Sequence, residues 1–354
     1  MSRFLSGKYA DLTPYTPGEQ PQDTQYVKLN TNESPFPPSE KAMAAAWKAM
    51  RPLQLYSDPD CRILREKLAA RYGVAPEEVL VTNGSDEALY FCFMAFCDKD
   101  HGAAFPNISY GFYPVFAQVN GIPYTAIPLK PDFSVDAGDY CGVGKTIFIA
   151  NPNAPTGMLL APAEIRRILD TNPDSVVVID EAYVDFGGES CIPLTHEFDN
   201  LLVVQTFSKS RSLAGGRLGY AIGNRALIAD LDALRYSTNP YNVNSATLAI
   251  GAAILDDEET TQRNCAVIIE NRAYTVAALR ELGFEVLDSR ANFVFARSPR
   301  VGGETLYRKL KARGVLVRHF TKPEIAQFNR ITIGTRQQMD ALLAAIRAIL
   351  EEEK

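Results

Sequence analysis

Histidine and cysteine are sparse in this chain of 354 residues, which narrows the kinds of site it can build. The three histidines stand singly at 101, 196 and 319, so a structural zinc site is not expected. The six cysteines form no CxxC pair and no disulfide-framework spacing. Several lie in apolar runs such as Tyr90–Met94, which predicts buried, unreactive thiols. We therefore expect neither a bound metal nor disulfides.

Long apolar runs and an excess of positive charge are lacking as well. No apolar run is long enough to span a bilayer, and the first residues contain no apolar signal core, so we expect a cytoplasmic protein. The net charge is −6 and the lysines and arginines are dispersed, which predicts no binding of nucleic acid or of a membrane surface. With 46% apolar and 22% charged residues, the composition is typical of a soluble globular protein.

The order of the predicted elements indicates an α/β fold with a large lobe. Residues 1–40 contain repeated prolines and predict an extended arm. From residue 78 onward, short apolar strands alternate with helical patterns, which is typical of a mainly parallel sheet with helices on both faces. Strands are expected at 79–81, 103–105, 146–150, 175–179, 201–205 and 219–222, and helices at 39–48, 62–72, 85–97, 111–119 and 162–169.

The pattern changes after residue 225 and predicts a smaller α+β lobe. Helices are expected at 226–236, 244–255, 258–282, 303–312 and 337–352, and short strands at 284–287, 293–296, 315–318 and 330–333. A chain of this length exceeds one ordinary hydrophobic core. We therefore predict an arm over 1–40 that packs with the small lobe, a large domain over 41–245 and a small domain over 246–354.

Polar residues follow four of the predicted strands, where open α/β sheets bind ligands. Lys209 comes just after the strand 201–205, with Ser208 beside it and Arg217 eight residues later. This stretch predicts a covalent lysine next to a bound phosphate. A solvated lysine in a polar loop is the alternative.

The other three strand ends point to the same kind of ligand. The turn Gly84-Ser85 opens a helix, with Asp86 in its first turn, whose free amides suit an anion or serve only as a helix cap. Asn153 lies in a turn and could donate to a ligand oxygen. Asp180 ends a fully apolar strand and needs a cationic partner, either a ring nitrogen or a salt bridge, and Tyr183 stands close by. A phosphorylated pyridine aldehyde satisfies all four strand ends together.

One further stretch, Gly142–Thr146, is similar to part of a phosphate-binding P-loop. The motif needs an earlier glycine where Asp139 stands, and it must precede a helix rather than a strand. A flexible turn is therefore predicted here. A nucleotide-binding switch or kinase is the alternative from another functional class.

The chain resembles the fold-type I pyridoxal-phosphate aminotransferases, in particular the histidinol-phosphate aminotransferase family, over nearly its whole length. The resemblance rests on an ordered series of motifs: Tyr15–Glu19, Lys28–Pro35, Tyr56–Asp60, Asn83–Ala88, Asn151–Gly157, Ser208–Tyr220 and Arg330–Gly334. It implies an aspartate-aminotransferase-like fold, pyridoxal phosphate as cofactor, and ping-pong transfer of an amino group between L-histidinol phosphate and 2-oxoglutarate. An aminotransferase for aromatic or other amino acids, or a decarboxylase of phosphothreonine type on the same fold, stays open.

The resemblance also implies roles for the matching residues. Lys209 would be the Schiff-base lysine and the base of the proton shift, Asp180 would pair with the pyridinium, and Asn153 and Tyr183 would contact the ring oxygen. Tyr110 would stack on the ring. The cofactor phosphate would be surrounded by Gly84, Ser85, Asp86, Ser208 and Arg217.

Substrate and partner contacts follow from the same resemblance. Arg330 would bind the anionic end of the substrate in a pocket lined by Tyr15, Asn32 and Asn153. Tyr56 would reach the cofactor phosphate of the neighbouring subunit, which implies a homodimer with shared active sites. The sequence departs from the better-known family members directly after the lysine, at Ser210-Arg211-Ser212.

Overall fold

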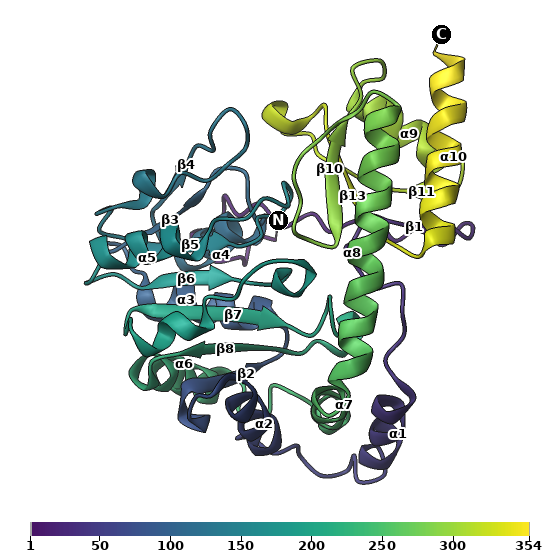
Figure 1. Ribbon diagram of the computed structural model, residues 1–354. Helices are drawn as coiled ribbons and strands as arrows, with labels where there is room; N and C mark the ends of the chain where they lie inside the picture. The colour runs from purple at the N-terminus through teal and green to yellow at the C-terminus, as the bar shows by residue number, and fades with distance from the viewer. Residues whose placement is uncertain (1, 354) are drawn as a thin grey trace.

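A seven-stranded sheet forms the larger of two lobes in the computed structural model, which describes residues 2–353 (Figure 1). Across the sheet the strands are β2 (Val79–Thr82), β8 (Gly219–Gly223), β7 (Leu201–Thr206), β6 (Val177–Asp180), β5 (Thr146–Ala150), β3 (Ala103–Pro106) and β4 (Tyr124–Ile127). All run parallel except β8, which is antiparallel to both neighbours. The predicted mainly parallel sheet is confirmed. The edge strand β4 was not predicted because three of its four residues are exposed and form no apolar run.

Helices cover both faces of this sheet, as predicted. One face packs against α3 (Ser85–Phe96), α4 (Phe112–Asn120) and α6 (Arg225–Thr238). The other face packs against α1 (Glu40–Ala49), α2 (Arg62–Tyr72), α5 (Pro162–Thr171) and α7 (Ser245–Leu255). Alternate residues of a strand face opposite sides. Phe148 of β5 therefore lies in one hydrophobic cluster, and its neighbours Ile147 and Ile149 lie in the other.

The smaller lobe contains a four-stranded antiparallel sheet covered by helices. Its strands are β12 (Arg318–His319), β13 (Asn329–Thr332), β10 (Phe293–Arg297) and β9 (Glu285–Val286), packed against α8 (Glu258–Glu281), α9 (Gly303–Ala312) and α10 (Arg336–Glu352). Near the amino terminus, β1 (Val27–Lys28) pairs in parallel with β11 (Val315–Leu316). The single strand expected at 315–318 is therefore divided between two sheets.

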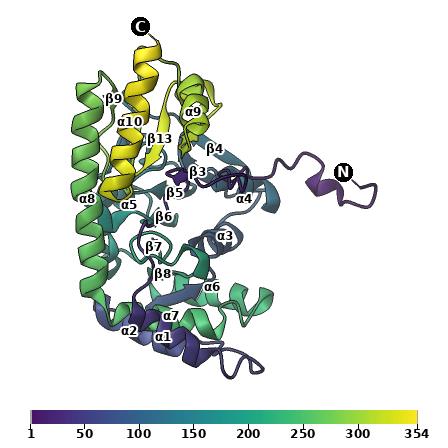
Figure 2. The same ribbon diagram turned by 90° about the vertical axis from the view of Figure 1, so that its right-hand side faces the viewer.

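The long helix α8 passes along both lobes (Figures 1 and 2). Just before it, Ala253 and Ile254 of α7 pack in one cluster with Leu64 and Leu68 of the large lobe. The domain boundary near residue 245 stays a prediction, and this packing leads us to propose that the small domain begins at α8. No helix within residues 2–353 is long and apolar enough to cross a membrane.

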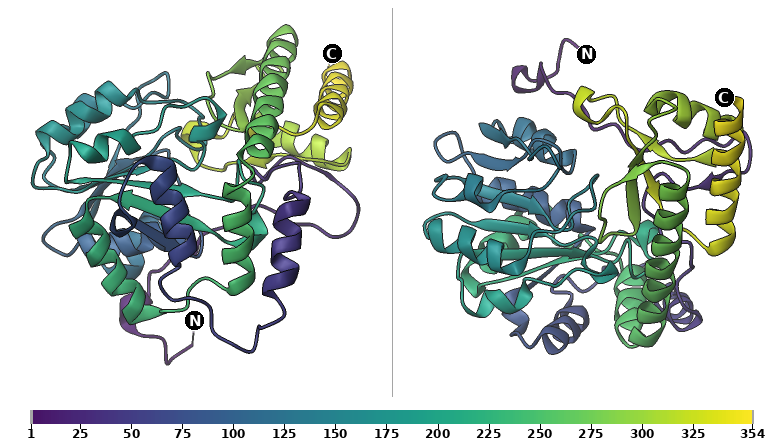
Figure 3. Two further views of the ribbon diagram at one scale, coloured as in Figure 1. Left: turned by 60° about the horizontal axis from the view of Figure 1, so that its bottom comes forward. Right: turned by 45° about the horizontal axis from the view of Figure 1, so that its top comes forward.

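The segment before β1 runs as an extended arm with one short 3₁₀ turn at Gly7–Tyr9. Its first residues project away from the body of the molecule (Figure 2). Two views from other directions show the same two lobes (Figure 3).

Candidate active site

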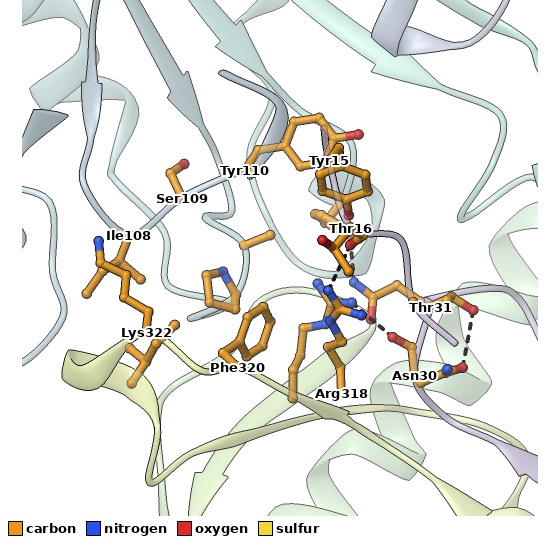
Figure 4. Close-up of a pocket in the computed structure, with 18 of the residues that line it drawn as sticks. Tyr15, Thr16, Asn30, Thr31, Ile108, Ser109, Tyr110, Arg318, Phe320 and Lys322 are labelled. Carbon is orange, nitrogen blue, oxygen red and sulfur yellow. Dashed lines mark hydrogen bonds between the residues drawn. The ribbon is translucent and has the colours of Figure 1, made fainter. Parts of the chain in front are cut away.

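The carboxyl ends of β5, β6 and β7 face the small lobe across a cavity of about 500 Å³. A smaller cavity adjoins it at the strand ends, and Tyr110, Tyr183 and Lys209 line both. Figure 4 shows Tyr15 and Tyr110 on one side of the larger cavity and Phe320 and Lys322 on the other. The structure brings together these predicted site residues around the two cavities: Tyr15, Asn32, Ser85, Asp86, Tyr110, Asp180, Tyr183, Ser208, Lys209, Arg217 and Arg330.

Lys209 lies at the junction of the two cavities. Its Nζ donates to the carbonyl oxygen of Thr31 at 3.3 Å and lies 6.0 Å from the centre of the Tyr183 ring. Burial, and next the positive charge of Arg330, lower the pKa of Lys209 to about 8. A neutral, nucleophilic amine is therefore accessible near neutral pH, as a covalent or proton-transferring lysine requires.

Asp180 ends β6 as a buried carboxyl. It accepts hydrogen bonds from the Tyr113 hydroxyl at 3.3 Å and from the backbone N–H of Ala182 at 3.2 Å. Within residues 2–353 no lysine or arginine forms an ion pair with it, and burial raises its pKa to about 7. The salt-bridge alternative thus finds no partner, and a cationic ring nitrogen fits this position.

An anion-binding group stands at the start of α3. Gly84 has a φ of +80°, and a side chain there would collide with the guanidinium of Arg217, 2.6 Å from its Cβ. Arg217 donates to Asp86 at 3.0 Å, so it already lies beside the free amides of the first helical turn. Ser208 lies on the opposite strand end, with its Oγ 3.0 Å from Thr206 Oγ1.

Close approach of backbone brings these elements together. Gly219 begins β8 opposite Thr82, and a Cβ at this position would lie 2.4 Å from the backbone nitrogen of Ser85. Only glycine allows β8 to pass so near the first turn of α3. The residue pair Gly84 and Gly219 therefore places the helix end against the strand that follows Arg217.

Tyr110 and Tyr183 line the small cavity together with Lys209 and Asp180, whereas Asn153 lines neither cavity. The Tyr110 hydroxyl donates to Asp86 at 2.5 Å, and the Tyr183 hydroxyl accepts from Asn32 at 3.0 Å. Asn153 is buried, and its amide donates to the Ile108 carbonyl at 3.0 Å and to Thr156 at 3.1 Å. Both N–H groups of the Asn153 amide already donate to these two oxygens. The contact of Asn153 with a ring oxygen therefore stays a prediction, and it requires one of these two hydrogen bonds to be replaced by a bond to the ring oxygen.

The cationic end of the cavity lies in the small lobe. Arg330 of β13 donates to the Asn30 carbonyl at 3.0 Å, while its buried Nε has no hydrogen-bond partner. Its guanidinium lies 5.4 Å from the Phe293 ring and 5.8 Å from the Phe320 ring. Burial lowers the pKa of Arg330, but a guanidinium stays charged at neutral pH. The side chain therefore presents a free donor and a charge for an anion.

Comparison with known proteins decides the family. The sequence profile described as aminotransferase class I and II matches residues 24–346. This chain belongs to that family. It is 46% identical to the histidinol-phosphate aminotransferase of Brachyspira hyodysenteriae over 353 residues, 99% of this chain and 100% of the relative. The corresponding protein of Aromatoleum aromaticum is 49% identical over 355 residues, again 99% and 100%.

A solved structure supports the fold of this aminotransferase. An aspartate aminotransferase mutant of Thermus thermophilus superimposes with a TM-score of 0.84 at 22% identity, covering 98% of this chain and 99% of that chain. At this identity the likeness concerns the fold alone. The predicted aspartate-aminotransferase-like architecture and the predicted family are both confirmed.

The strand-end residues of the aminotransferase fit pyridoxal phosphate. The buried Asp180 without a cation suits the ring nitrogen, and the near-neutral amine of Lys209 suits the aldehyde. Arg217, Ser208 and the first turn of α3 suit the phosphate. Thr206, which lines the same cavity, was not predicted, although it ends β7 as Asp180 ends β6.

Two further cations of the aminotransferase site were not predicted. Arg318 donates to the carbonyls of Thr16 and Pro17, each at 2.9 Å, and Lys322 donates to the carbonyl of Asn107 at 2.8 Å. Both line the large cavity together with Arg330. No pattern near them in the sequence indicated a ligand, because the small lobe offers no row of parallel strand ends.

The remaining predicted residues differ in their surroundings. Tyr15 lines the large cavity and stacks on Phe112 with ring centres 4.1 Å apart. Asn32 has a φ of +56° and is held by two hydrogen bonds of 3.0 Å with Thr332. Tyr56 lies outside both cavities and is 82% exposed. A role for Tyr56 therefore requires a second subunit.

Proposed function

We propose that this aminotransferase transfers the amino group of L-histidinol phosphate to 2-oxoglutarate by a ping-pong mechanism, with pyridoxal phosphate as its cofactor. The observation that carries the proposal is a single cavity in which the Lys209 amine faces Arg330, an arginine with an unpartnered buried nitrogen. The relatives named histidinol-phosphate aminotransferase support this substrate, since they match the chain over its full length.

Each part of the reaction has a residue placed for it. When bound, pyridoxal phosphate supplies an electron-withdrawing ring that weakens the α-carbon–hydrogen bond of the donor and carries the amino group between half-reactions. Lys209 would hold the cofactor covalently and, once its amine is free, would move the proton from the donor carbon to the cofactor carbon. Asp180 would keep the ring nitrogen protonated, because a buried carboxylate stabilises a cation strongly. Arg217 and the first turn of α3 would hold the cofactor phosphate.

The charge of the cavity favours a phosphorylated donor. The residues that line it within the described part of the chain include Lys209, Arg318, Lys322 and Arg330 but no aspartate or glutamate. A phosphate ester carries up to two negative charges and pairs well with arginine forks. An aromatic amino acid offers only its carboxylate to these cations, so the surroundings support the phosphate ester over the aromatic alternative.

Product analysis separates the proposed function from the decarboxylase alternative. The enzyme loaded with pyridoxal phosphate is given either histidinol phosphate with 2-oxoglutarate or O-phosphothreonine alone. We expect glutamate to form with the first and no carbon dioxide to be released from the second. Carbon dioxide release without glutamate formation would contradict the proposal.

Replacing Arg330 by methionine should lower kcat/KM for histidinol phosphate roughly a hundredfold or more, since truncating one partner of a buried charge pair costs about 2–5 kcal/mol. The kcat/KM for histidinol, which lacks the phosphate, should fall far less, because histidinol has no phosphate to pair with Arg330. Steady-state kinetics with both donors measures the difference. Arg308→Met, on the exposed surface of α9, is the matched control and should behave as wild type. An equal loss for both donors would show that Arg330 does not recognise the phosphate.

We also propose that the enzyme is a homodimer with shared active sites. Large apolar side chains are exposed on α1, on the loop after it and at the start of α2: Trp47, Met50, Leu53, Leu55, Tyr56 and Ile63. Figure 3 (left) shows these two helices in the foreground. Apolar surface of this extent is typical of a protein interface. A partner docked here is the setting in which Tyr56 reaches the cofactor phosphate of the other subunit.

The double variant Trp47→Asp, Leu55→Asp should convert the dimer to monomer and lower kcat at least about tenfold, because two charges would be buried at the centre of the interface. Light scattering after size exclusion gives the mass, and the same fractions are assayed for activity. Ile269→Asp alters an exposed apolar residue of α8 and should stay dimeric. A wild-type protein of monomeric mass that is fully active would contradict shared sites.

A cytoplasmic location is proposed as well. All six cysteines are unpaired, and all but Cys141 are buried. Free thiols persist in a reducing compartment.

A further inference from the structure

The three residues that follow Lys209 each bond to a different part of the protein. Ser210 donates to Asp185 in the 3₁₀ turn Val184–Phe186, and Ser212 lies 2.8 Å from Ser34 through their hydroxyl groups. Between them, Arg211 donates from Nη1 to Glu258 Oε2 at 3.1 Å. The loop that carries Lys209 is thus held from three directions.

Arg211 makes the one ionic contact of the three. Its side chain is 1% exposed, and the guanidinium lies 5.4 Å from the Phe207 ring. Burying a guanidinium is costly unless a carboxylate compensates its charge. Here Glu258 forms the ion pair, and Arg71 of α2 also contacts it at 2.7 Å. The nearby Asp185 also raises the pKa of Arg211. Nη2 of Arg211 has no hydrogen-bond partner, so displacing the loop from Glu258 would break the ion pair of a buried guanidinium.

The other end of this contact is the first residue of α8. A carboxylate at a helix amino terminus is further stabilised by the helix dipole. Glu258 begins α8, whose first end lies beside α7 of the large lobe and which then runs along the small lobe (Figure 1). Arg211 therefore joins the lysine loop to the helix that leads into the lobe carrying Arg330.

We propose that Arg211, anchored by Glu258, is a positioning residue that fixes the main chain beside Lys209 and so holds the lysine amine inside the active-site cavity. The proposal rests on the role of Lys209 in the proposed function. It assigns Arg211 no contact with substrate or cofactor, because its side chain lines neither active-site cavity. The charge of Arg211 pairs with Glu258. Arg211 acts on Lys209 by fixing the position of the main chain that carries both residues.

The test uses Arg211→Met in the cofactor-loaded enzyme, with Arg211→Lys and Arg71→Met beside it. A lysine amine displaced by about 1 Å should lower kcat roughly 10- to 100-fold, while KM for the donor changes less than about threefold. Arg211→Lys should recover part of kcat because the charge pair is retained. Arg71→Met removes a cation from the same carboxylate without touching the loop, so its kcat should stay near wild type.

A second readout needs neither cofactor nor turnover. In the cofactor-free protein, an amine-reactive reagent labels Lys209 to a greater extent as the pH rises. Mass spectrometry of the peptide that contains Lys209 gives the pH at which labelling is half-maximal, here called the labelling midpoint. Burial and Arg330 hold the pKa of Lys209 at about 8. In Arg211→Met the amine should become less buried, so the midpoint should rise towards that of an ordinary lysine. Arg71→Met should keep the wild-type midpoint.

The proposal is overturned if Arg211→Met retains the wild-type kcat and labelling midpoint. It is also overturned if Arg211→Met and Arg71→Met lower kcat equally, in step with their loss of Tm, since that pattern indicates general destabilisation. Should Arg211→Met fail to fold, Glu258→Gln, which keeps the shape of the side chain, replaces it with the same expected shifts. An inactive wild-type enzyme would count against the proposed function, whereas the labelling curves test Arg211 separately.

Discussion

Replacing Lys209 by alanine should lower kcat at least about a thousandfold, because one substitution removes both the covalent anchor and the base. Its amine lies in the cavity with Arg330, and its pKa of about 8 makes the neutral form available. Among the described residues that line the small cavity at the strand ends Lys209 is the one lysine, and Lys322 lines only the large cavity, bonded to Asn107. We therefore expect no substitute base.

Steady-state assays and the absorbance of the covalently bound cofactor measure this loss. Lys145→Ala is the matched control: this half-buried lysine contacts Thr125 and belongs to the stretch that is similar to part of a P-loop. It should retain full activity. A Lys209→Ala enzyme that keeps both turnover and the absorbance band would remove Lys209 from the mechanism.

Asp180→Asn should lower kcat roughly a hundred- to a thousandfold, as expected when a preorganised charge at a reacting centre is neutralised. The side chain keeps its shape, its oxygen can still accept from the Ala182 N–H, and its amide nitrogen can donate to the Tyr113 hydroxyl in place of the present bond, so the main change is the loss of charge. An amide cannot hold the ring nitrogen in its protonated form. Kinetics with histidinol phosphate measures the loss, and activity within about threefold of wild type would contradict this role.

The same substitution should stabilise the cofactor-free protein. Burial raises the pKa of Asp180 to about 7, from a value of 3.8 for an ordinary aspartate. Between these values the folded protein retains a proton that the unfolded chain has released, so stability falls as pH rises through this window. Asp180→Asn removes this contribution and should raise Tm above wild type at pH values near 8.

Thermal unfolding of the two cofactor-free proteins across pH tests this expectation. Glu181, whose pKa burial also raises to about 7, is present in both proteins. The informative quantity is therefore the difference between the two curves. Parallel curves would show that Asp180 carries no buried charge in the folded protein.

Sequence patterns revealed the large lobe and the centre of its site for one physical reason. A buried parallel strand is a run of apolar residues, and the polar residue that ends it stands out. Asp180 after Val177–Ile179 and Lys209 after β7 were found in this way. The resemblance to known aminotransferases then added Arg330 and Tyr15, which no local pattern marks.

The features that the sequence did not reveal depend on contacts between residues far apart in the chain. Arg318 and Lys322 enter the cavity from the small lobe, where β11 and β12, within residues 315–319, belong to two different sheets. The edge strand β4 lacks an apolar run. The hydrogen bonds of Asn153 to Ile108 and Thr156 also depend on neighbours that only the folded chain brings together.

The most direct test of the proposed function is single-turnover conversion of the cofactor-loaded enzyme by one amine donor at a time. The panel is histidinol phosphate, histidinol, an aromatic amino acid and O-phosphothreonine, followed by absorbance without an acceptor. We predict conversion by histidinol phosphate at least about a hundredfold faster than by histidinol or the aromatic amino acid, since the phosphate contact with the buried arginine contributes about 2–5 kcal/mol. Equal or faster conversion by the aromatic amino acid would contradict the account.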